Sequence, residues 1–564
     1  ESSCTVPVVV EPGGDGVVAH VGLHALGRFG DRLGLGDCLS GAGGWSGERS
    51  PVHDRGKVLV QAMLMFAGGG EACPDIETLR AQAGLFGSVP LDSTLWRTFN
   101  DDLDTPTRER LWAAMGKIRA GVWERSSATH SGEVVLDIDA SLHEIHSENK
   151  EGTAPNYKRG FGFHPLYCTA DATGESLAVK LRPGNATANN IADHVEVLDQ
   201  AIASLGESVR VGHREGDRPD TVGRRVRVRA DSAGCTAFVH RCRERNIGFS
   251  VVARRNANVH AAISRVAYDD DAWAPALTQA GKPRKGAAVT DVTAHGDMSA
   301  WPEGTRLIVR REPLHPGAQG SLFPSVMYRF WGHYTDSGLD PVAADLDMRA
   351  HARVEDNICR LKDSGANRFP FKNLAANAAW LDVVCFGDTL VRWFQMLCVS
   401  GPLATAEPKT MRWQFWHTPA RIVSHARRHF VRIIDGWPTT REILAAYHRI
   451  ELLIWAHQPR DARPAPVRPR TRLSTRPKPG QNPEIATPAA TNTPKLTVTP
   501  PPGFQSTNPP PHPNSHEESG LVRQPDDRSN RHLVQGMDPA PGTSLGGRST
   551  AYRKPDSRVR PLTG

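Results

Sequence analysis

The chain has 564 residues, with 68 Lys and Arg against 61 Asp and Glu and a net charge of +7 at pH 7. The surplus lies in the last part of the chain, because 16 basic residues stand against 8 acidic ones from Pro459 onward, and 52 stand against 53 before it. The composition therefore excludes a body that attracts nucleic acid by bulk charge, and any DNA affinity must come from local basic patches.

The sequence shows no pattern typical of an exported or membrane protein. No leading run combines basic residues, a long apolar stretch and a small-residue cleavage site, so we expect a cytoplasmic location. The longest apolar region, around 379–403, contains Asp382, Asp388 and Arg392, which predicts a buried core helix rather than a membrane span. The nine cysteines form no CxxC pair, which argues against a zinc site and suits a reducing compartment.

Residues 1–125 are predicted to form a helical N-terminal domain. Apolar residues recur at helical spacing in four stretches separated by Gly and Pro, namely 22–39, 57–66, 75–84 and 93–119. Such a domain can recognise DNA ends by placing a helix in a groove. The alternative is a packing domain that only buttresses the rest of the chain.

The centre of the chain changes to an α/β pattern. The predicted elements are strands at 133–143, 161–170 and 175–182, a helix at 187–205, a strand at 225–231, a helix at 235–246 and a strand at 248–253. This order is that of a ribonuclease H-like fold, in which the first and fourth strands lie side by side. We expect a catalytic core from 126–254 and 337–400, interrupted by a β-rich insertion at 255–336.

The remaining chain is predicted to be helical and then disordered. Helices are expected at 351–363 and 372–398, followed by a basic helical C-terminal region at 401–458. Its basic stretch, 409–432, contains the candidate DNA-binding residues Arg421, Arg427 and Arg428. From 459 to 564 the chain is rich in proline and poor in apolar residues, so we expect a disordered tail that is solvated or adds weak DNA affinity.

Three acidic residues stand where metal-dependent phosphodiester chemistry would place them. Asp139 lies in the strand-like run 133–141, Asp231 ends the β-rich run 226–232, and Glu355 lies in the helical stretch 349–362. Two strand-end aspartates and a helical glutamate can converge on two divalent ions about 3.5–4 Å apart. Mg²⁺ prefers such carboxylate oxygens, whereas an isolated acidic residue at a strand end is usually a solvated or capping group.

Basic residues surround Glu355 at helical spacing. Lys362 lies two turns after it and His351 one turn before it, while Arg349 and Arg353 flank them. Cations beside an acidic group on one helix face can hold phosphate oxygens while the acid binds metal. The alternative is an amphipathic surface helix stabilised by i, i+4 pairs.

Several segments together resemble one family of bacterial transposases. These are 136–166 (beginning LDIDASLHEIHSENK), 181–190 (LRPGNATANN), 229–234 (RADSAG), 351–363 (HARVEDNICRLKD) and 373–380 (NLAANAAW). They look like insertion-sequence family thirteen-eighty, a DDE transposase group related to the superfamily with a Tyr-Arg-Glu-Lys signature. The resemblance covers about residues 15–450. Lys362 matches the signature's Lys, but His351 and Met348 occupy its Arg and Tyr positions.

The resemblance implies a ribonuclease H-like core with Asp139, Asp231 and Glu355 as metal ligands and Lys362 beside them as a catalytic residue. Asp137 is an alternative to Asp139 because alternation puts both on one strand face; we prefer Asp139, since Asp-Ala-Ser resembles the Asp-x-Thr of the family's first block. In related transposases an aromatic residue of the insertion can stack a flipped base. Three tryptophans stand there, Trp273, Trp301 and Trp331, with core packing as the alternative for each.

The implied activity is cleavage at insertion-sequence ends and strand transfer into target DNA. The implied cofactor is Mg²⁺, with Mn²⁺ able to substitute. The partners would be the terminal inverted repeats, the target DNA and a second copy of the chain, in a bacterial, nucleoid-associated setting. Two alternatives remain: a ribonuclease H-fold nuclease without strand transfer, and a catalytically inactive DNA-binding remnant.

Overall fold

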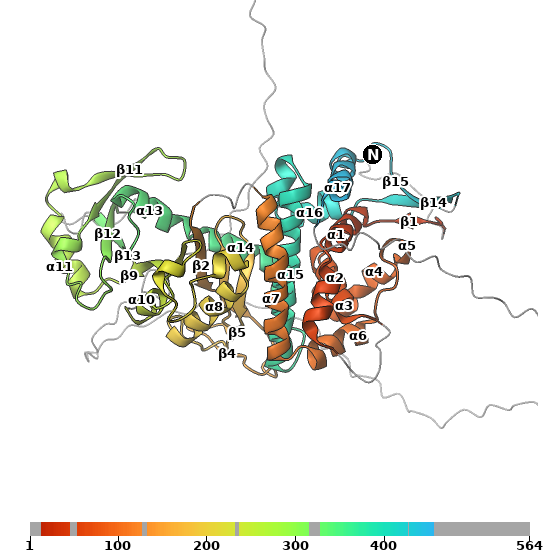
Figure 1. The fold of residues 1–564 in the computed structure, drawn as a ribbon, viewed down its shortest axis with the longest axis horizontal. Coiled ribbons are helices and arrows are strands. Elements are labelled where there is room, and N and C mark those ends of the chain that lie inside the picture. Colours follow the sequence, from red (N-terminus) through yellow and green to blue (C-terminus); the bar gives the residue numbers. More distant parts are fainter. Residues whose placement is uncertain are drawn as a thin grey trace, which may run out of the picture. The chain divides into compact units, whose positions relative to one another are not determined.

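The computed structural model of the protein describes residues 13–45, 53–126, 132–231, 236–314, 328–426 and 428–455 (Figure 1). The predicted Pro-rich tail and Arg427 lie outside the described residues.

Short parallel strands form the middle of the main sheet. β2 (Val134–Ala140) pairs in parallel with β8 (Val226–Ala230), and β8 pairs in parallel with β9 (Gly248–Ala253). On the other side of β2, β6 (Leu166–Ala170) and β7 (Ser176–Lys180) continue the sheet with antiparallel pairing. The expectation that the first and fourth predicted strands lie side by side is confirmed by the pairing of β2 with β8.

The segment predicted as an insertion extends this same sheet. Four strands add antiparallel beyond β9, so that the complete order is β10-β11-β12-β13-β9-β8-β2-β6-β7. They are β10 (Ala274–Leu277), β11 (Pro283–Asp291), β12 (Arg306–Pro313) and β13 (Tyr328–Thr335). A separate small sheet, of order β3-β5-β4, is formed by β3 (His143–Glu144), β4 (Ala154–Pro155) and β5 (Phe161–Phe163).

The two faces of the main sheet differ in character. On one face, apolar side chains such as Leu136, Val228 and Phe249 form a core with α8 and α10. The helices beside the sheet are α8 (Ile191–Ala203), α9 (Glu207–Arg210), α10 (Thr236–Arg243), α11 (Ala257–Val266), α13 (Pro341–Ala350) and α14 (Arg353–Leu361). Because strand side chains alternate, the opposite face of β2 and β8 carries polar residues, and α13 and α14 contact that face.

Helices from both ends of the chain share one hydrophobic core. The N-terminal helices are α1 (Val21–Arg32), α2 (Leu35–Gly43), α3 (Arg55–Ala67), α4 (Glu77–Arg80), α5 (Ala83–Phe86), α6 (Asp92–Arg97) and α7 (Thr105–Arg125). The C-terminal ones are α15 (Leu374–Cys398), α16 (Pro408–Met411) and α17 (Thr440–Leu452). Aromatic pairs join the two groups: the rings of Phe66 and Trp380 lie 4.7 Å apart, as do those of Trp112 and Phe386.

α15 is the helix that the apolar region around 379–403 was expected to form. It is long and apolar enough to cross a membrane, but 89% of its most apolar stretch is buried inside the protein. Its polar residues find partners there, since Asp382 accepts a hydrogen bond from Arg108 and Asp388 accepts one from Arg392. The prediction of a buried core helix is confirmed.

The basic stretch 409–432 was predicted as a helix, and that prediction is wrong for its second half. Residues 420–433 form a β-hairpin of β14 (Ala420–His425) and β15 (Arg428–Ile433), and β1 (Val17–Val18) pairs with β14. β-Branched and aromatic residues, including Val423 and Phe430, favour extended strands over a helix. We call residues 420–433 the basic hairpin.

Candidate active site

Two aspartates come together at the carboxyl ends of adjacent parallel strands. Ile138 of β2 is in register with Ala230 of β8, so the next residues along the two strands are Asp139 and Asp231. Neighbouring strands lie about 4.8 Å apart, which brings the two carboxylates to one edge of the sheet. The order of the strands along the chain predicts that these two aspartates lie close together, and the pairing of β2 with β8 agrees with this.

Glu355 approaches the aspartates from the start of a helix. The helical stretch 349–362 is not one continuous helix, because α13 ends at Ala350 and α14 begins at Arg353, within two residues of the start of the helix predicted at 351–363. At the joint, the amide of Glu355 donates to the carbonyl of Ala352, three residues back, which tightens the turn. Glu355 therefore lies in the first turn of α14, where the helix dipole favours a negative charge.

The three carboxylates interact electrostatically at this edge. Burial, followed by the negative charge of Asp231, raises the pKa of Asp139 to about 7, and the charge of Glu355 acts in the same direction. The charge of His351 and a hydrogen bond from the Ala140 amide oppose the rise. A cation between the carboxylates would relieve this repulsion.

Asp139→Asn is expected to stabilise the metal-free protein at pH 8. Because the folded-state pKa of Asp139 lies above the unfolded value of 3.8, its ionisation costs stability as pH rises from about 4 to about 7, and the full cost remains above that. An uncharged asparagine avoids the cost, so the variant should gain on the order of 2–4 kcal/mol at pH 8 and only about 1 kcal/mol at pH 4.5. Urea unfolding in EDTA at both pH values measures this, with Asp356→Asn, an exposed neighbour of Glu355, as the control.

The alternative ligand Asp137 is already fully engaged. It is 0% exposed, and its two oxygens accept hydrogen bonds from Nε and Nη2 of Arg229 at 2.8 and 2.7 Å. Oδ1 also accepts from Nδ1 of His351 at 2.8 Å. These hydrogen bonds to His351 and Arg229 hold the pKa of Asp137 below its usual value against the effect of burial. The geometry thus separates Asp137 from Asp139, which the sequence pattern could not.

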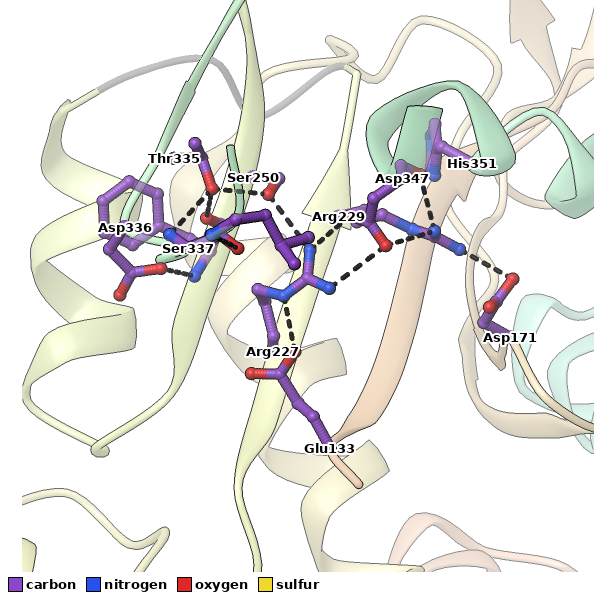
Figure 2. Close-up of polar contacts among 12 residues, drawn as sticks. Glu133, Asp171, Arg227, Arg229, Ser250, Thr335, Asp336, Ser337, Asp347 and His351 are labelled. Atoms are coloured by element: carbon purple, nitrogen blue, oxygen red, sulfur yellow. Dashed lines mark hydrogen bonds and ion pairs between the residues drawn. The ribbon is translucent and has the colours of Figure 1, made fainter. Parts of the chain in front are cut away.

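Arg229 joins four segments of the chain (Figure 2). Besides Asp137, its guanidinium contacts the carboxylate of Asp171 at 2.7 Å and donates to the carbonyl of Asp347 at 2.8 Å. The residue is 0% exposed, and its positive charge is compensated only by these acidic neighbours. Nearby carboxylates, with Asp137 foremost, raise the pKa of Arg229 above its ordinary value against the effect of burial.

Arg227, two residues earlier in β8, repeats this arrangement at the far end of the same strand face (Figure 2). Its guanidinium makes a bidentate pair with Asp347, contacts Glu133 at 2.7 Å and donates to Ser250. Asp347 of α13 therefore binds both arginines, which fixes α13 over β8.

Three residues spaced by four along α13 and α14 connect this network to the carboxylates. Asp347 holds Arg227 and Arg229, Nδ1 of His351 donates to Asp137, and Glu355 follows one turn later. Since His351 is 7% exposed, it acts here as a buried link between α13 and β2. The buried network positions Glu355 over the ends of β2 and β8.

The basic candidates around Glu355 have different surroundings. Nζ of Lys362 donates to Ser141 and to the carbonyl of Leu142, just beyond Asp139, and burial lowers its pKa. Arg349 is tied to Asp345 at 2.9 Å. The side chain of Arg353 is 55% exposed and contacts Asp171 at 3.2 Å. Lys362 and Arg353 are thus the two cations best placed for a phosphate.

A pocket of about 240 Å³ opens beside Asp231 and Glu355. Val252, Gly332, Met348 and Trp331 line it. Of the three tryptophans singled out above, Trp273 is 7% exposed and Trp301 stacks on Tyr334 with ring centroids 3.7 Å apart, so both serve packing. Trp331 is 52% exposed and is the one that faces the candidate site.

One comparison with known proteins, the family model, bears on this chemistry. The family model described as "Transposase DDE domain group 1" matches residues 3–455 of the chain. The chain belongs to this family of DDE transposase domains. No curated protein matches the chain. Among solved structures, a cryo-EM structure of a piggyBac transposase synaptic complex with hairpin DNA is similar with a TM-score of 0.35 and 10% identity, over 70% of this chain and 80% of that one. A likeness of this size carries no further argument.

The donor set of this DDE-family chain fits a divalent cation in chemistry. Asp139, Asp231 and Glu355 would supply hard oxygen ligands, and a cation would neutralise the charge repulsion that, together with burial, raises the pKa of Asp139. Within the described ranges, no three His, Cys, Asp or Glu side chains are already arranged to hold a metal ion. The carboxylates would therefore have to move closer on binding.

Several residues of the DDE-family site were not foreseen. Arg229, Asp171 and Asp347 were not among the candidates, although Arg229 lies two residues before Asp231. The alternation Val-Arg-Val-Arg in β8 was the available signal, since it puts two cations on the face of Asp231. Arg421 and Arg428 belong to the basic hairpin and not to the carboxylate cluster.

Proposed function

We propose that this chain is a DNA transposase that cuts at insertion-sequence ends and joins the freed 3′ hydroxyls to target DNA. The observation that carries the proposal is that Asp139 and Asp231 lie at the ends of paired parallel strands, with the negative charge of Glu355 close enough to raise the pKa of Asp139. Family membership supports the reaction class. The motifs quoted above favour insertion-sequence family thirteen-eighty.

Each residue of the cluster has a distinct part in this proposal. Asp139, Asp231 and Glu355 would hold Mg²⁺, or Mn²⁺ in its place. Bound there, the metal would activate the attacking oxygen and stabilise the leaving one. Lys362 would turn from Ser141 to a phosphate oxygen near the cut, and Arg353 would neutralise the neighbouring phosphate. His351 and Arg349 would contact other protein residues rather than DNA, and would thereby orient the segment that carries Glu355.

The topology supports a ribonuclease H-like catalytic core. Across this part of the sheet the strands stand in the order β7-β6-β2-β8-β9, which are the third, second, first, fourth and fifth strands of the core along the chain. β6 is antiparallel to both of its neighbours, β7 and β2, whereas β2, β8 and β9 are parallel to one another. This is the arrangement expected for that fold. A homodimer on paired DNA ends is part of the proposal, because concerted cutting of two ends requires two such sites.

Cleavage of labelled DNA that carries the element's own ends tests the function. With Mg²⁺ the wild type should nick the end and join the labelled 3′ strand to a plasmid, and EDTA should stop both steps. Asp231→Asn and Glu355→Gln should lose at least about 10²-fold in rate while DNA binding in EDTA persists, because charge stabilisation at the reacting phosphate is lost. Asp356→Asn, next to Glu355 and exposed, serves as the matched control and should cleave like the wild type.

The alternatives give different results in the same assay. Cleavage without joining would favour a nuclease that lacks strand transfer. DNA binding by the wild type without any cleavage would favour an inactive remnant. Equal loss in Asp356→Asn and Glu355→Gln would contradict the assignment of Glu355.

A further inference from the structure

The basic hairpin presents one face that carries cations around an apolar centre. In its register Arg421 lies opposite Arg432, Val423 opposite Phe430, and His425 opposite Arg428. Residues directly opposite each other project to the same side of a two-stranded ribbon, so these three pairs share one face. Arg421, Arg428 and Arg432 are exposed, and Phe430 is 43% exposed between them.

Among the described residues, no carboxylate pairs with the arginines of this face. Arg421 donates to the backbone carbonyl of Asp15, at 3.2 Å. In the part of the chain that the structure describes, neither Arg428 nor Arg432 contacts a carboxylate. By contrast, Arg227, Arg229, Arg245 and Arg310 each pair with acidic side chains. An uncompensated cationic surface attracts a polyanion.

The hairpin is nevertheless firmly attached at its base. Ile422 and Ile433, on the other face, pack against the helical core. β1 pairs along β14, and the amide of Ile422 donates to the carbonyl of Gly16 at 2.7 Å. Gly16 has φ +75°, and a Cβ there would lie 2.4 Å from the carbonyl oxygen of Ile422, so only glycine permits this approach. The base is therefore fixed, while Arg421, Phe430 and Arg432 of the other face are exposed.

The segment leading into the hairpin also touches the element that carries Lys362. Nη1 of Arg412 donates to the carbonyl of Asp363 at 3.0 Å, and Lys409 pairs with the carboxylate of Asp363 at 2.9 Å. The hairpin thus starts from a segment anchored next to the candidate active site.

We propose that the face of the basic hairpin formed by Arg421, Arg428, Phe430 and Arg432 docks duplex DNA, as a β-ribbon that enters a groove with its arginines on the flanking phosphates. A two-stranded ribbon fits the major groove, which is about 12 Å wide. The arginines would supply sequence-independent affinity, and Phe430 would contact the groove floor. This inference rests on the proposed function, because it gives the DNA of that reaction a place on the protein.

A second copy of the chain is the competing occupant of this surface. β15 is an edge strand of the β1-β14-β15 sheet, and such edges can pair with another strand. Arg428 and Arg432 would meet the same cations in an identical edge, and charged residues on edge strands disfavour such pairing. The charge therefore favours DNA.

Fluorescence anisotropy with a labelled 30-bp duplex of arbitrary sequence, in EDTA from about 50 to 300 mM salt, tests the proposal without requiring cleavage. Arg428→Ala/Arg432→Ala should weaken binding about tenfold at 100 mM salt and reduce the slope of log K against log salt by about 1.8, because each lost phosphate contact removes about 0.9. Arg428→Lys/Arg432→Lys keeps the charges and should keep the slope. Arg218→Ala/Arg241→Ala removes two other exposed arginines as a matched control.

The proposal is supported if the salt slope is reduced in Arg428→Ala/Arg432→Ala but not in the lysine variant or in the control. An unchanged slope, or an equal loss in the control, overturns it, and so does a change from dimer to monomer in light scattering without a change in slope. These outcomes are separate from the proposed function, which depends on metal-dependent cleavage. If the wild type cleaves as expected but the Arg428→Ala/Arg432→Ala variant keeps the wild-type salt slope, the proposed function stands and the assignment of DNA to the basic hairpin falls.

Discussion

Asp139→Asn is expected to reduce Mg²⁺-dependent DNA cleavage by about 10³-fold or more, which corresponds to about 4 kcal/mol in activation free energy. The carboxylate stands at the edge where β2 meets β8, and its ionisation is opposed by Asp231, so it is poised to bind a cation. The asparagine keeps the shape but removes the charge. Single-turnover cleavage at saturating protein measures the chemical step, and folding is not lost, because this variant is expected to be more stable at pH 8.

The same substitution at the neighbouring aspartate should give the opposite pattern. Asp137→Asn weakens a buried pair with Arg229, which is expected to cost about 3 kcal/mol in unfolding free energy. Any loss of cleavage should then follow the fraction of unfolded protein and recover at lower temperature. If Asp137→Asn abolished cleavage in a fully folded protein while Asp139→Asn did not, the ligand assignment would have to be exchanged.

The second large effect is expected from Arg229→Met. Removing the guanidinium leaves Asp137 buried with only His351 as a partner and removes one of the two β8 arginines that hold Asp347, so the unfolding free energy should fall by about 3–5 kcal/mol. Urea unfolding at pH 7 measures the loss. Arg218→Met is the control, because its pair with Asp220 is solvent-exposed and worth at most about 1 kcal/mol.

A double-mutant cycle shows whether the pair acts as a unit. Asp137→Asn/Arg229→Met should cost less than the two single losses combined, since no unpaired charge remains to be buried. Additive losses would mean that Arg229 stabilises the fold through Asp171 and Asp347 rather than through Asp137.

Much of the candidate site followed from the sequence because it depends on local order. The succession of strands predicted that β2 and β8 are neighbours. Because Asp139 and Asp231 stand near the ends of these strands, their proximity followed. The supporting network could not be predicted in this way. Asp347 lies 118 residues from Arg229, and only the folded chain brings it over β8. Alternating valine and arginine is typical of a half-solvated strand, yet β8 is buried on both faces.

The basic hairpin was missed for a different physical reason. A high density of arginine and histidine gives no periodicity of its own, so residues 409–432 were assigned to a helix by their neighbourhood. The pairing of Ile422 with Val431 and of Val423 with Phe430 joins two β-prone runs that are close in sequence, and their strand propensity outweighs the helical context of the neighbouring segments. The helical joint after Ala350 was equally hidden, because the sequence 349–362 contains no proline or glycine.

The way the insertion adds to the main sheet limits how this enzyme can be shortened. β13 occupies the edge of β9 through the pairs from Ala253–Gly332 to Ser250–Thr335. Trimming residues 255–336 to shorten the chain would leave the backbone donors and acceptors on one side of β9 without partners, and such bare edges promote aggregation. Miniaturisation should therefore retain β13 and shorten the strands outside it.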